Sequence, residues 1–197
     1  MNTLIIYDWD DTLFPTSYIH RIADFQTNKF SIIERFNIRL LEKSRQSGHV
    51  LIITNAATEW IYASAKKYMY RLYQYLKYTN IPVISAREFA NSRQMYNYEK
   101  WKDITFYDTI NRYMNITHKH INNIISVGDA MFERNALIKY GHYINNKEQY
   151  RAPNNIYIKT IKYINNPIPD ALINQTKSLL NNIEYHIQVK GDLNIDM

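Results

Sequence analysis

Residues 3–12, which read TLIIYDWDDT, decide the fold class of this chain. Five apolar or β-branched residues in succession end at Asp8. Such a run is typical of a strand that is buried on both faces of a parallel sheet. Three later runs have the same form: residues 50–53 before Thr54, residues 81–84 before Ser85, and residues 124–127 before Gly128 and Asp129.

Helical patterns alternate with these runs. Residues 33–41 carry apolar side chains at helical spacing, and Gly48 stands where a helix should end. A longer apolar stripe over residues 61–76 predicts one helix. Residues 156–163 predict a further strand, and Pro169 opens a helix that continues past Ile183. The alternation predicts a three-layer α/β/α Rossmann-like fold with a central, mainly parallel sheet.

Length and composition indicate one globular unit. The chain has 197 residues, 46% of them hydrophobic, which predicts a single domain over residues 1–185 and a frayed tail over residues 186–197. No cysteine is present, so disulfides, thiolate metal sites and cysteine nucleophiles are excluded. No signal peptide and no run of about 18 apolar residues is found, so we expect a soluble, intracellular, cytoplasmic protein without a membrane partner.

The charge favours anionic partners only in a general way. The formal net charge is +6, but Lys and Arg are scattered and form no dense block. This balance permits nucleic acid as a partner without arguing for it. The 18 tyrosines are better explained by packing than by base stacking.

The polar strand ends should meet at one edge of the sheet, where ligands bind in open α/β folds. Residues two apart in an extended chain point the same way, so Asp8 and Asp10 can flank one point. A bound Mg²⁺ would stabilise one carboxylate as an anion and leave the other free to carry a proton. The plainer alternative is a solvated acidic loop that caps the next segment.

The spacing Asp8-x-Asp10-x-Thr12 after an apolar strand resembles motif I of the haloacid dehalogenase (HAD) superfamily. Thr54 at the end of an apolar strand resembles motif II. Lys102 is similar to the lysine of motif III, and Gly128-Asp129 with Glu133 resembles motif IV. Taken singly, Thr54 could simply end a strand, Lys102 could lie on the surface, and the two acids could form the first turn of a helix.

Four stretches are also similar to a little-described group of protist and algal members of this superfamily. They favour Lys102 over Lys100 as the motif III lysine. The stretches are residues 53–56 with Trp60, residues 84–87, residues 101–102 and residues 126–134. The resemblance covers nearly the whole chain and implies a HAD-like domain.

The resemblance implies a phosphatase with Mg²⁺ as its cofactor. Asp8 would attack phosphorus to form an aspartyl-phosphate, and Asp10 would act as acid and then as base. An acid at the position of Asp10 implies phosphate-ester chemistry rather than dehalogenation. The metal ligands would be the Asp8 carboxylate, the Asp10 main-chain carbonyl, Asp129 and Glu133, while Thr54, Asn55 and Lys102 would bind the phosphoryl group.

Neither of the gaps at residues 13–49 and 86–101 is long enough for a cap domain. An open site suits a phosphorylated macromolecule, either a nucleic-acid end or a phosphoprotein, although small-molecule substrates stay open. Three functions are therefore to be distinguished. They are phosphate-monoester hydrolysis, phosphoryl transfer to an acceptor other than water, and recognition of phosphorylated partners without turnover.

Overall fold

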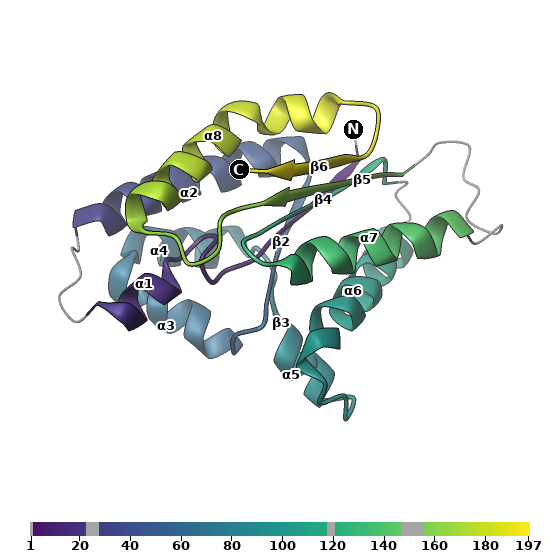
Figure 1. Ribbon diagram of the computed structural model, residues 1–197, viewed down its shortest axis with the longest axis horizontal. Coiled ribbons are helices and arrows are strands. Elements are labelled where there is room, and N and C mark those ends of the chain that lie inside the picture. The colour runs from purple at the N-terminus through teal and green to yellow at the C-terminus, as the bar shows by residue number, and fades with distance from the viewer. Residues whose placement is uncertain (1, 23–27, 118–120, 147–155) are drawn as a thin grey trace.

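Six parallel strands form one sheet in the computed structural model, which describes residues 2–22, 28–117, 121–146 and 156–197 (Figure 1). The order across the sheet is β3-β2-β1-β4-β5-β6. The strands are β1 Thr3–Tyr7, β2 His49–Thr54, β3 Val83–Ser85, β4 Asn123–Gly128, β5 Tyr157–Lys162 and β6 Leu193–Asp196. The predicted α/β class and parallel sheet are confirmed.

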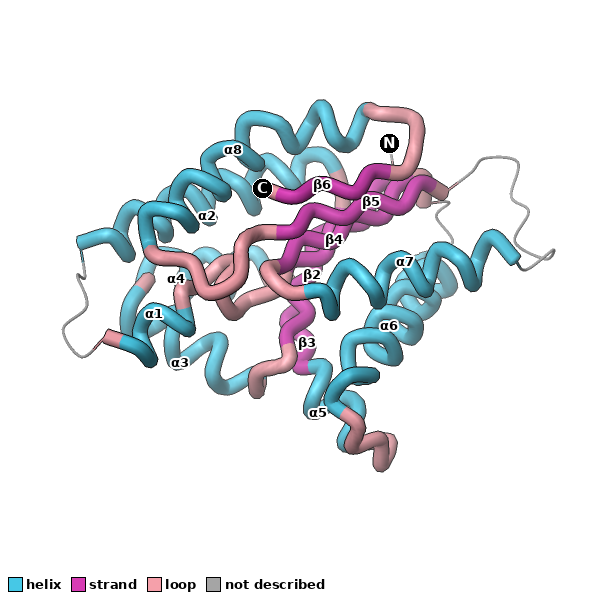
Figure 2. The backbone as a smooth tube through the Cα atoms, viewed as in Figure 1, coloured by secondary structure: helices cyan, strands magenta, loops and turns pink. Residues whose placement is uncertain are grey.

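Helices cover both faces of the sheet and complete the three layers (Figure 2). One layer contains α1 Thr16–Arg21, α2 Asn28–Ser47, α3 Thr58–Tyr68, α4 Tyr70–Thr79 and α8 Pro169–Gln188. The other contains α5 Ala86–Asn91, the 3₁₀ turn η1 Tyr98–Lys100, α6 Trp101–Thr117 and α7 Met131–Asn146.

Alternate residues of β1 enter the two halves of the core. Ile5 and Tyr7 pack in the cluster under α2 and α8, whereas Leu4 and Ile6 pack in the cluster under α6 and α7. All four side chains are buried, and each buried aliphatic side chain contributes about 1.5–3 kcal/mol. Burial on both faces is the reason that the strand reads as a continuous apolar run.

The path of the chain creates a switch point between β1 and β4. From β1 the chain adds β2 and β3 on one side, and it then crosses over to add β4, β5 and β6 on the other. In the register, Tyr7 lies opposite both Ile52 and Val127. Asp8 therefore emerges at the carboxyl ends of the central strands, where open α/β sheets bind their ligands.

The single helix predicted over residues 61–76 is wrong, because the chain forms α3 and α4 with a break at Met69. The backbone of Met69 has φ −139° and ψ 66°, outside the helical region, and its side chain is buried. Each helix then turns its own apolar residues to the core, Ile61 and Ala65 in α3 and Leu72 and Leu76 in α4. No proline or glycine marks the break in the sequence.

The frayed tail predicted over residues 186–197 is also wrong. Helix α8 continues to Gln188, and β6 then pairs in parallel with β5 at the edge of the sheet. Arg134 fixes this edge by donating to the Ile195 carbonyl at 2.7 Å and pairing with Asp196 at 2.8 Å. The domain therefore extends to the last strand, because backbone pairing and Arg134 compensate for its few apolar residues.

Among the described helices, none combines the length and the apolar character that a membrane span requires.

Candidate active site

A buried lysine joins two acids at the centre of the carboxyl edge. The Lys102 ammonium lies 2.6 Å from Oδ1 of Asp8 and 2.9 Å from Oε1 of Glu133, and it also donates to the Ile53 carbonyl. Lys102 is only 1% exposed, and Asp8 and Glu133 are 5% and 4% exposed. The first turns of α6 and α7 carry Lys102 and Glu133 to Asp8, which follows β1.

The charges of this cluster depend on one another. Burial by itself would lower the pKa of Lys102, but the carboxylates of Asp8 and Glu133 outweigh it and raise the pKa to about 12. Burial raises the pKa of Asp8 well above its usual range, Lys102 opposes that shift, and Glu133 adds to it. Lys102 is therefore fixed as a cation, and it supports the ionised form of Asp8.

Three donors hold the Asp10 carboxylate. Thr16 donates to Oδ1 at 2.5 Å, the indole N–H of Trp60 donates to the same oxygen at 3.0 Å, and Thr54 donates to Oδ2 at 3.2 Å. Asp10 is half-buried, so it remains accessible at the mouth of the site. Asp8 and Asp10 thus have different environments, one against an ammonium and the other among neutral donors.

Asp11 has a structural part in the site. Its backbone φ is 54°, and its carboxylate accepts the Ser17 N–H at 2.9 Å and the Ser17 hydroxyl. These bonds fasten the start of α1 and so place Thr16 against Asp10.

Asp129 and Glu133 complete an acidic group around Asp8. Burial, with the neighbouring charges of Glu133 and Asp11, raises the pKa of Asp129 to about 7. Oε2 of Glu133 is buried and has no hydrogen-bond partner among the described residues. A Cβ at position 128 would lie 2.5 Å from Cγ and 2.6 Å from Oε2 of Glu133, so this carboxylate requires Gly128.

The remaining predicted residues lie at the end of β2. Thr54 is fully buried, and its hydroxyl accepts the Ala56 N–H at 3.1 Å while it donates to Asp10. This hydroxyl would have to turn from Asp10 to donate to a phosphoryl oxygen. Oδ1 of Asn55 is buried without a partner among the described residues. The structure thus brings together Asp8, Asp10, Thr54, Lys102, Asp129 and Glu133, with Asn55 beside them.

The oxygen donors suit a hard divalent cation. Asp8, Asp10, Asp129 and Glu133 are four carboxyl groups, and Lys102 is the only cation of the described chain in an ion pair with any of them. Oε2 of Glu133 lacks a hydrogen-bond partner among the described residues, and burial, followed by the charges of Glu133 and Asp11, raises the pKa of Asp129. Among the described residues, no group of three or more His, Cys, Asp or Glu side chains is arranged so that it could hold a metal ion by itself. Mg²⁺ commonly uses only one or two carboxylates, with water and phosphate as its other ligands, so the type of donor at this site is compatible with the ion.

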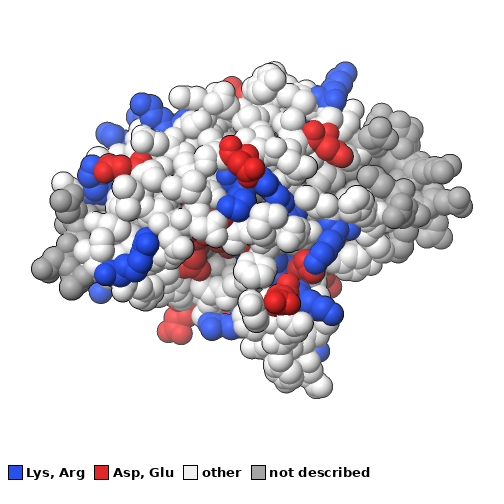
Figure 3. All heavy atoms as spheres, viewed as in Figure 1, with Lys and Arg blue, Asp and Glu red and all other residues white. Residues whose placement is uncertain are grey.

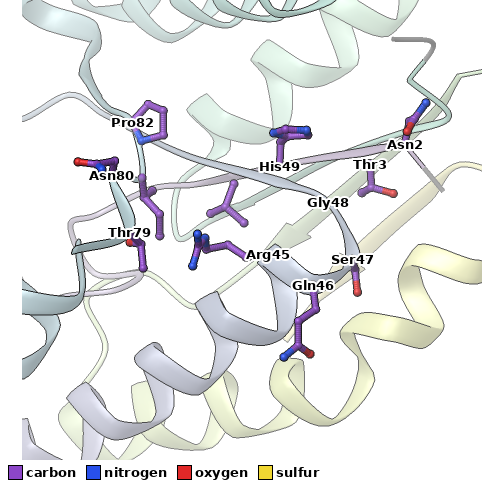
Figure 4. Close-up of a pocket in the computed structure, with 12 residues that line it drawn as sticks. Asn2, Thr3, Arg45, Gln46, Ser47, Gly48, His49, Thr79, Asn80 and Pro82 are labelled. Atoms are coloured by element: carbon purple, nitrogen blue, oxygen red, sulfur yellow. The ribbon is translucent and has the colours of Figure 1, made fainter. Parts of the chain in front are cut away.

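A separate hollow lies at the opposite, amino ends of the strands (Figure 4). It has a volume of about 470 Å³ and is formed by the end of α2, the starts of β1 and β2, and the segment before β3. Arg45 and His49 are among its polar residues, and none of the described residues that line it carries a carboxylate. The hollow therefore lacks the groups expected for the chemistry of the carboxyl edge.

Two residues that contact Asp10 were not predicted as site residues. Thr16 follows Pro15 in a segment without a motif, and Trp60 carried a resemblance but no role. The sequence offered one indication for Thr16, which is that it is a polar residue near the end of a strand. Many other residues also meet this description. Their roles depend on the folding of α1 and α3 against the site.

Comparison of the chain with protein-family models, with curated proteins and with solved structures finds no match.

Proposed function

We propose that this protein is a Mg²⁺-dependent phosphohydrolase that acts on phosphate monoesters through an aspartyl-phosphate at Asp8. The observation that carries the proposal is the buried contact of Lys102 with Asp8 and Glu133, with Asp10 and Asp129 beside it. The resemblance of the same residues to the HAD motifs supports this choice. A plain acidic loop would not need a fully buried lysine at its centre.

In the first step, a carboxylate oxygen of Asp8 attacks phosphorus and forms a P–O bond, while the bond to the leaving oxygen breaks. Asp10 gives its proton to that oxygen. Lys102 orients Asp8 and places positive charge beside the phosphoryl group as negative charge develops there. Trp60 and Thr16 hold the Asp10 carboxyl in place, while the Thr54 hydroxyl would turn from Asp10 to a phosphoryl oxygen.

In the second step, Asp10 takes a proton from water, and the water oxygen attacks phosphorus. The bond to Asp8 breaks, which releases inorganic phosphate and restores the carboxylate. General acid and base catalysis contributes about 10²–10⁴ in rate. Uncatalysed monoester hydrolysis needs accelerations of up to about 10²¹, so most of the effect must come from positioning and electrostatics.

The Asp8 carboxylate, the Asp10 main-chain carbonyl, Asp129 and Glu133 would hold Mg²⁺. The ion, when bound, supplies positive charge for the transferring phosphoryl oxygens. It would also reduce the repulsion among the four acids, so binding should stabilise the folded protein.

The direct test is Mg²⁺-dependent release of p-nitrophenol from p-nitrophenyl phosphate. Asp8→Asn should abolish turnover while it leaves the melting temperature measurable, because the side chain keeps its size. Asp170→Asn, on the exposed first turn of α8, is the matched control and should retain activity. Robust turnover by Asp8→Asn would remove Asp8 as the nucleophile.

A second measurement tests the metal site without any reaction. Mg²⁺ at about 100 times its Kd should raise the stability of the wild type by about 2.7 kcal/mol, seen as a thermal shift. Asp129→Asn should lose most of the shift, whereas Asp170→Asn should keep it. An equal shift in both variants would place the ion elsewhere.

The two alternative functions give different results. A module that only recognises phosphorylated partners should bind without turnover, and beryllium fluoride should not form an adduct at Asp8. A phosphotransferase should consume substrate faster than it releases free phosphate. Equal rates of substrate loss and phosphate release would support hydrolysis.

A further inference from the structure

We infer that the substrate is a single-stranded nucleic-acid end that carries a terminal phosphate, with unpaired bases stacking on two aromatic pairs beside the site. The inference rests on the proposed function, because it names the substrate of the same acids. The pairs are Tyr98 with Phe132 and His20 with Trp60. They belong to elements that cover opposite faces of the sheet.

The first pair lies where α6 and α7 begin. The rings of Tyr98 and Phe132 are 6.0 Å apart and nearly perpendicular, at 72°. Tyr98 is 55% exposed, although it stands four residues before Lys102. Phe132 is half-buried and directly precedes Glu133. An aromatic side chain exposed this close to a phosphate site offers a flat apolar surface to the rest of the substrate.

The second pair lies on α1 and α3, which belong to the other helical layer. The His20 ring stacks on Trp60 with centroids 6.0 Å apart and an angle of 24°. Trp60 also packs against Phe14, with the two rings nearly perpendicular. His20 is exposed, and Trp60 donates to Asp10. This pair thus connects the acid and base of the proposed reaction to an exposed ring.

The cations near the first pair suit a phosphodiester backbone. Arg87 and Lys100 are exposed, and neither forms an ion pair within the described chain. They follow β3 and precede Lys102, on the segments that lead to the site. Figure 3 shows Lys and Arg dispersed among acidic residues on the face drawn there. Sequence-tolerant sites for single strands combine aromatic rings, on which the bases stack, with cations that follow the backbone.

A phosphopeptide is the weaker choice. Phosphopeptide sites depend on clustered arginines that pair with the phosphate. Here, within the described chain, Lys102 is the cation in contact with Asp8, and acids surround it. The exposed groups beside the site include the rings of Tyr98 and His20, which match bases better than they match a charged peptide.

The test compares substrates that differ only in their bases. Phosphate release is measured from 5′- and 3′-phosphorylated oligothymidylate, from the same sugar-phosphate chains without bases, and from a phosphoserine peptide. One of the two base-bearing ends should have a kcat/KM about tenfold or more above that of its abasic counterpart, the order expected for one base stacked on an aromatic ring.

Substitutions then assign the effect to Tyr98. Tyr98→Ala should reduce the ratio of base-bearing to abasic kcat/KM about tenfold through KM, while Tyr98→Phe should preserve the ratio. Tyr78→Ala is the matched control, because Tyr78 is 87% exposed at the far end of α4. Arg87→Ala and Lys100→Ala should each reduce the salt dependence of binding by about 0.7 in the log–log slope.

Equal rates with and without bases, or a preference for the phosphopeptide, would overturn the inference and leave the phosphohydrolase proposal intact. Failure of the wild type to hydrolyse any phosphate ester would instead overturn the proposed function. Fluorescence anisotropy with the labelled oligonucleotides separates these cases. If the base-bearing oligonucleotide binds more tightly than the abasic one and Tyr98→Ala removes the difference, the proposed base stacking is supported even without turnover. Equal binding of the base-bearing and abasic oligonucleotides would refute it.

Discussion

Two lysines are completely buried in this protein, one near the carboxyl ends of the strands and one near their amino ends. The groups that they contact differ. Lys102, at the carboxyl edge, contacts the carboxylates of Asp8 and Glu133. Lys159, at the amino edge, donates to three carbonyls at the end of α8: those of His186 at 2.6 Å, Ile187 at 3.1 Å and Val189 at 2.7 Å. Its ammonium also lies 5.8 Å from the centroid of the Tyr157 ring. A buried cation among carbonyls completes a helix end, whereas the cation between the two acids would, in the proposed reaction, place positive charge beside the phosphoryl group.

The largest effect is expected from Lys102→Met. Removal of the cation should lower turnover about 10²–10³-fold. In the absence of Mg²⁺ it should also lower the free energy of unfolding by about 3–5 kcal/mol, because two buried acids lose their partner. Steady-state kinetics and urea denaturation measure the two effects. Lys177→Met, on the exposed face of α8, should change neither quantity. Full activity in Lys102→Met would contradict a role of Lys102 in the proposed reaction that Lys159 does not share.

Lys159→Met should separate stability from activity. We expect a loss of about 2–3 kcal/mol, because buried carbonyl acceptors lose their donor, with kcat unchanged below the melting temperature. Burial lowers the pKa of Lys159 to about 8 from 10.5, with Asp192 opposing. A large fall in kcat at full folding would contradict the structural role.

The same pKa shift gives the pH dependence a definite sign. The unfolded chain binds the proton more tightly than the folded chain, so the stability of the wild type relative to Lys159→Met should rise between about pH 8 and 10.5. It should be flat below that window. Denaturant titrations of both proteins across this range measure the difference.

Two glycines, Gly128 near the carboxyl ends of the strands and Gly48 near their amino ends, allow the same comparison with smaller expected losses of stability. Gly128→Ala would press on the Glu133 side chain, and Gly48→Ala would place Cβ 2.3 Å from the Thr3 carbonyl oxygen. Each should cost about 1–3 kcal/mol, but only Gly128→Ala should also weaken Mg²⁺ binding in the thermal-shift assay. Gly191→Ala has open space and should stay within about 0.5 kcal/mol of the wild type. Equal Mg²⁺ affinity in Gly128→Ala would argue against Glu133 as a ligand.

The smallest effect is expected from Trp60→Phe, which keeps an aromatic ring but removes the hydrogen bond to Asp10. Turnover of p-nitrophenyl phosphate should fall about tenfold, the rate equivalent of roughly 1.4 kcal/mol. Trp101→Phe removes a comparable bond, to the Met95 carbonyl at 3.1 Å, and should leave kcat unchanged. Equal kcat values for the two variants would remove the positioning role of Trp60.

The strands could be predicted because burial on both faces imposes a continuous apolar run, as in residues 3–7. The polar residues that end these apolar runs identified Asp8, Thr54 and Asp129, because the carboxyl ends of parallel strands meet where open α/β sheets bind their ligands. The break at Met69 could not be predicted, because it depends on two helices packing separately. The edge strand at residues 193–196 depends on pairing with β5, which leaves little pattern in four residues.

Within the site, the charged residues were easier to predict than the residues that position them. Lys102 could be chosen through a resemblance, but its complete burial between two acids follows only from the folded arrangement. The contacts of Thr16 and Trp60 with Asp10 join segments that are distant along the chain or lack a motif. Such contacts leave no periodic signal in a single sequence.

The central claim is that Asp8 takes up the phosphoryl group before water does. The most direct measurement is the stereochemical course at phosphorus, with a thiophosphate monoester that carries 16O and 18O as its non-bridging oxygens and is hydrolysed in water labelled with 17O. Two successive in-line displacements predict retention of configuration in the inorganic thiophosphate, which carries sulfur and three different oxygen isotopes, together with no turnover by Asp8→Asn. Inversion would mean that the acceptor attacks the substrate directly, and it would contradict the aspartyl-phosphate.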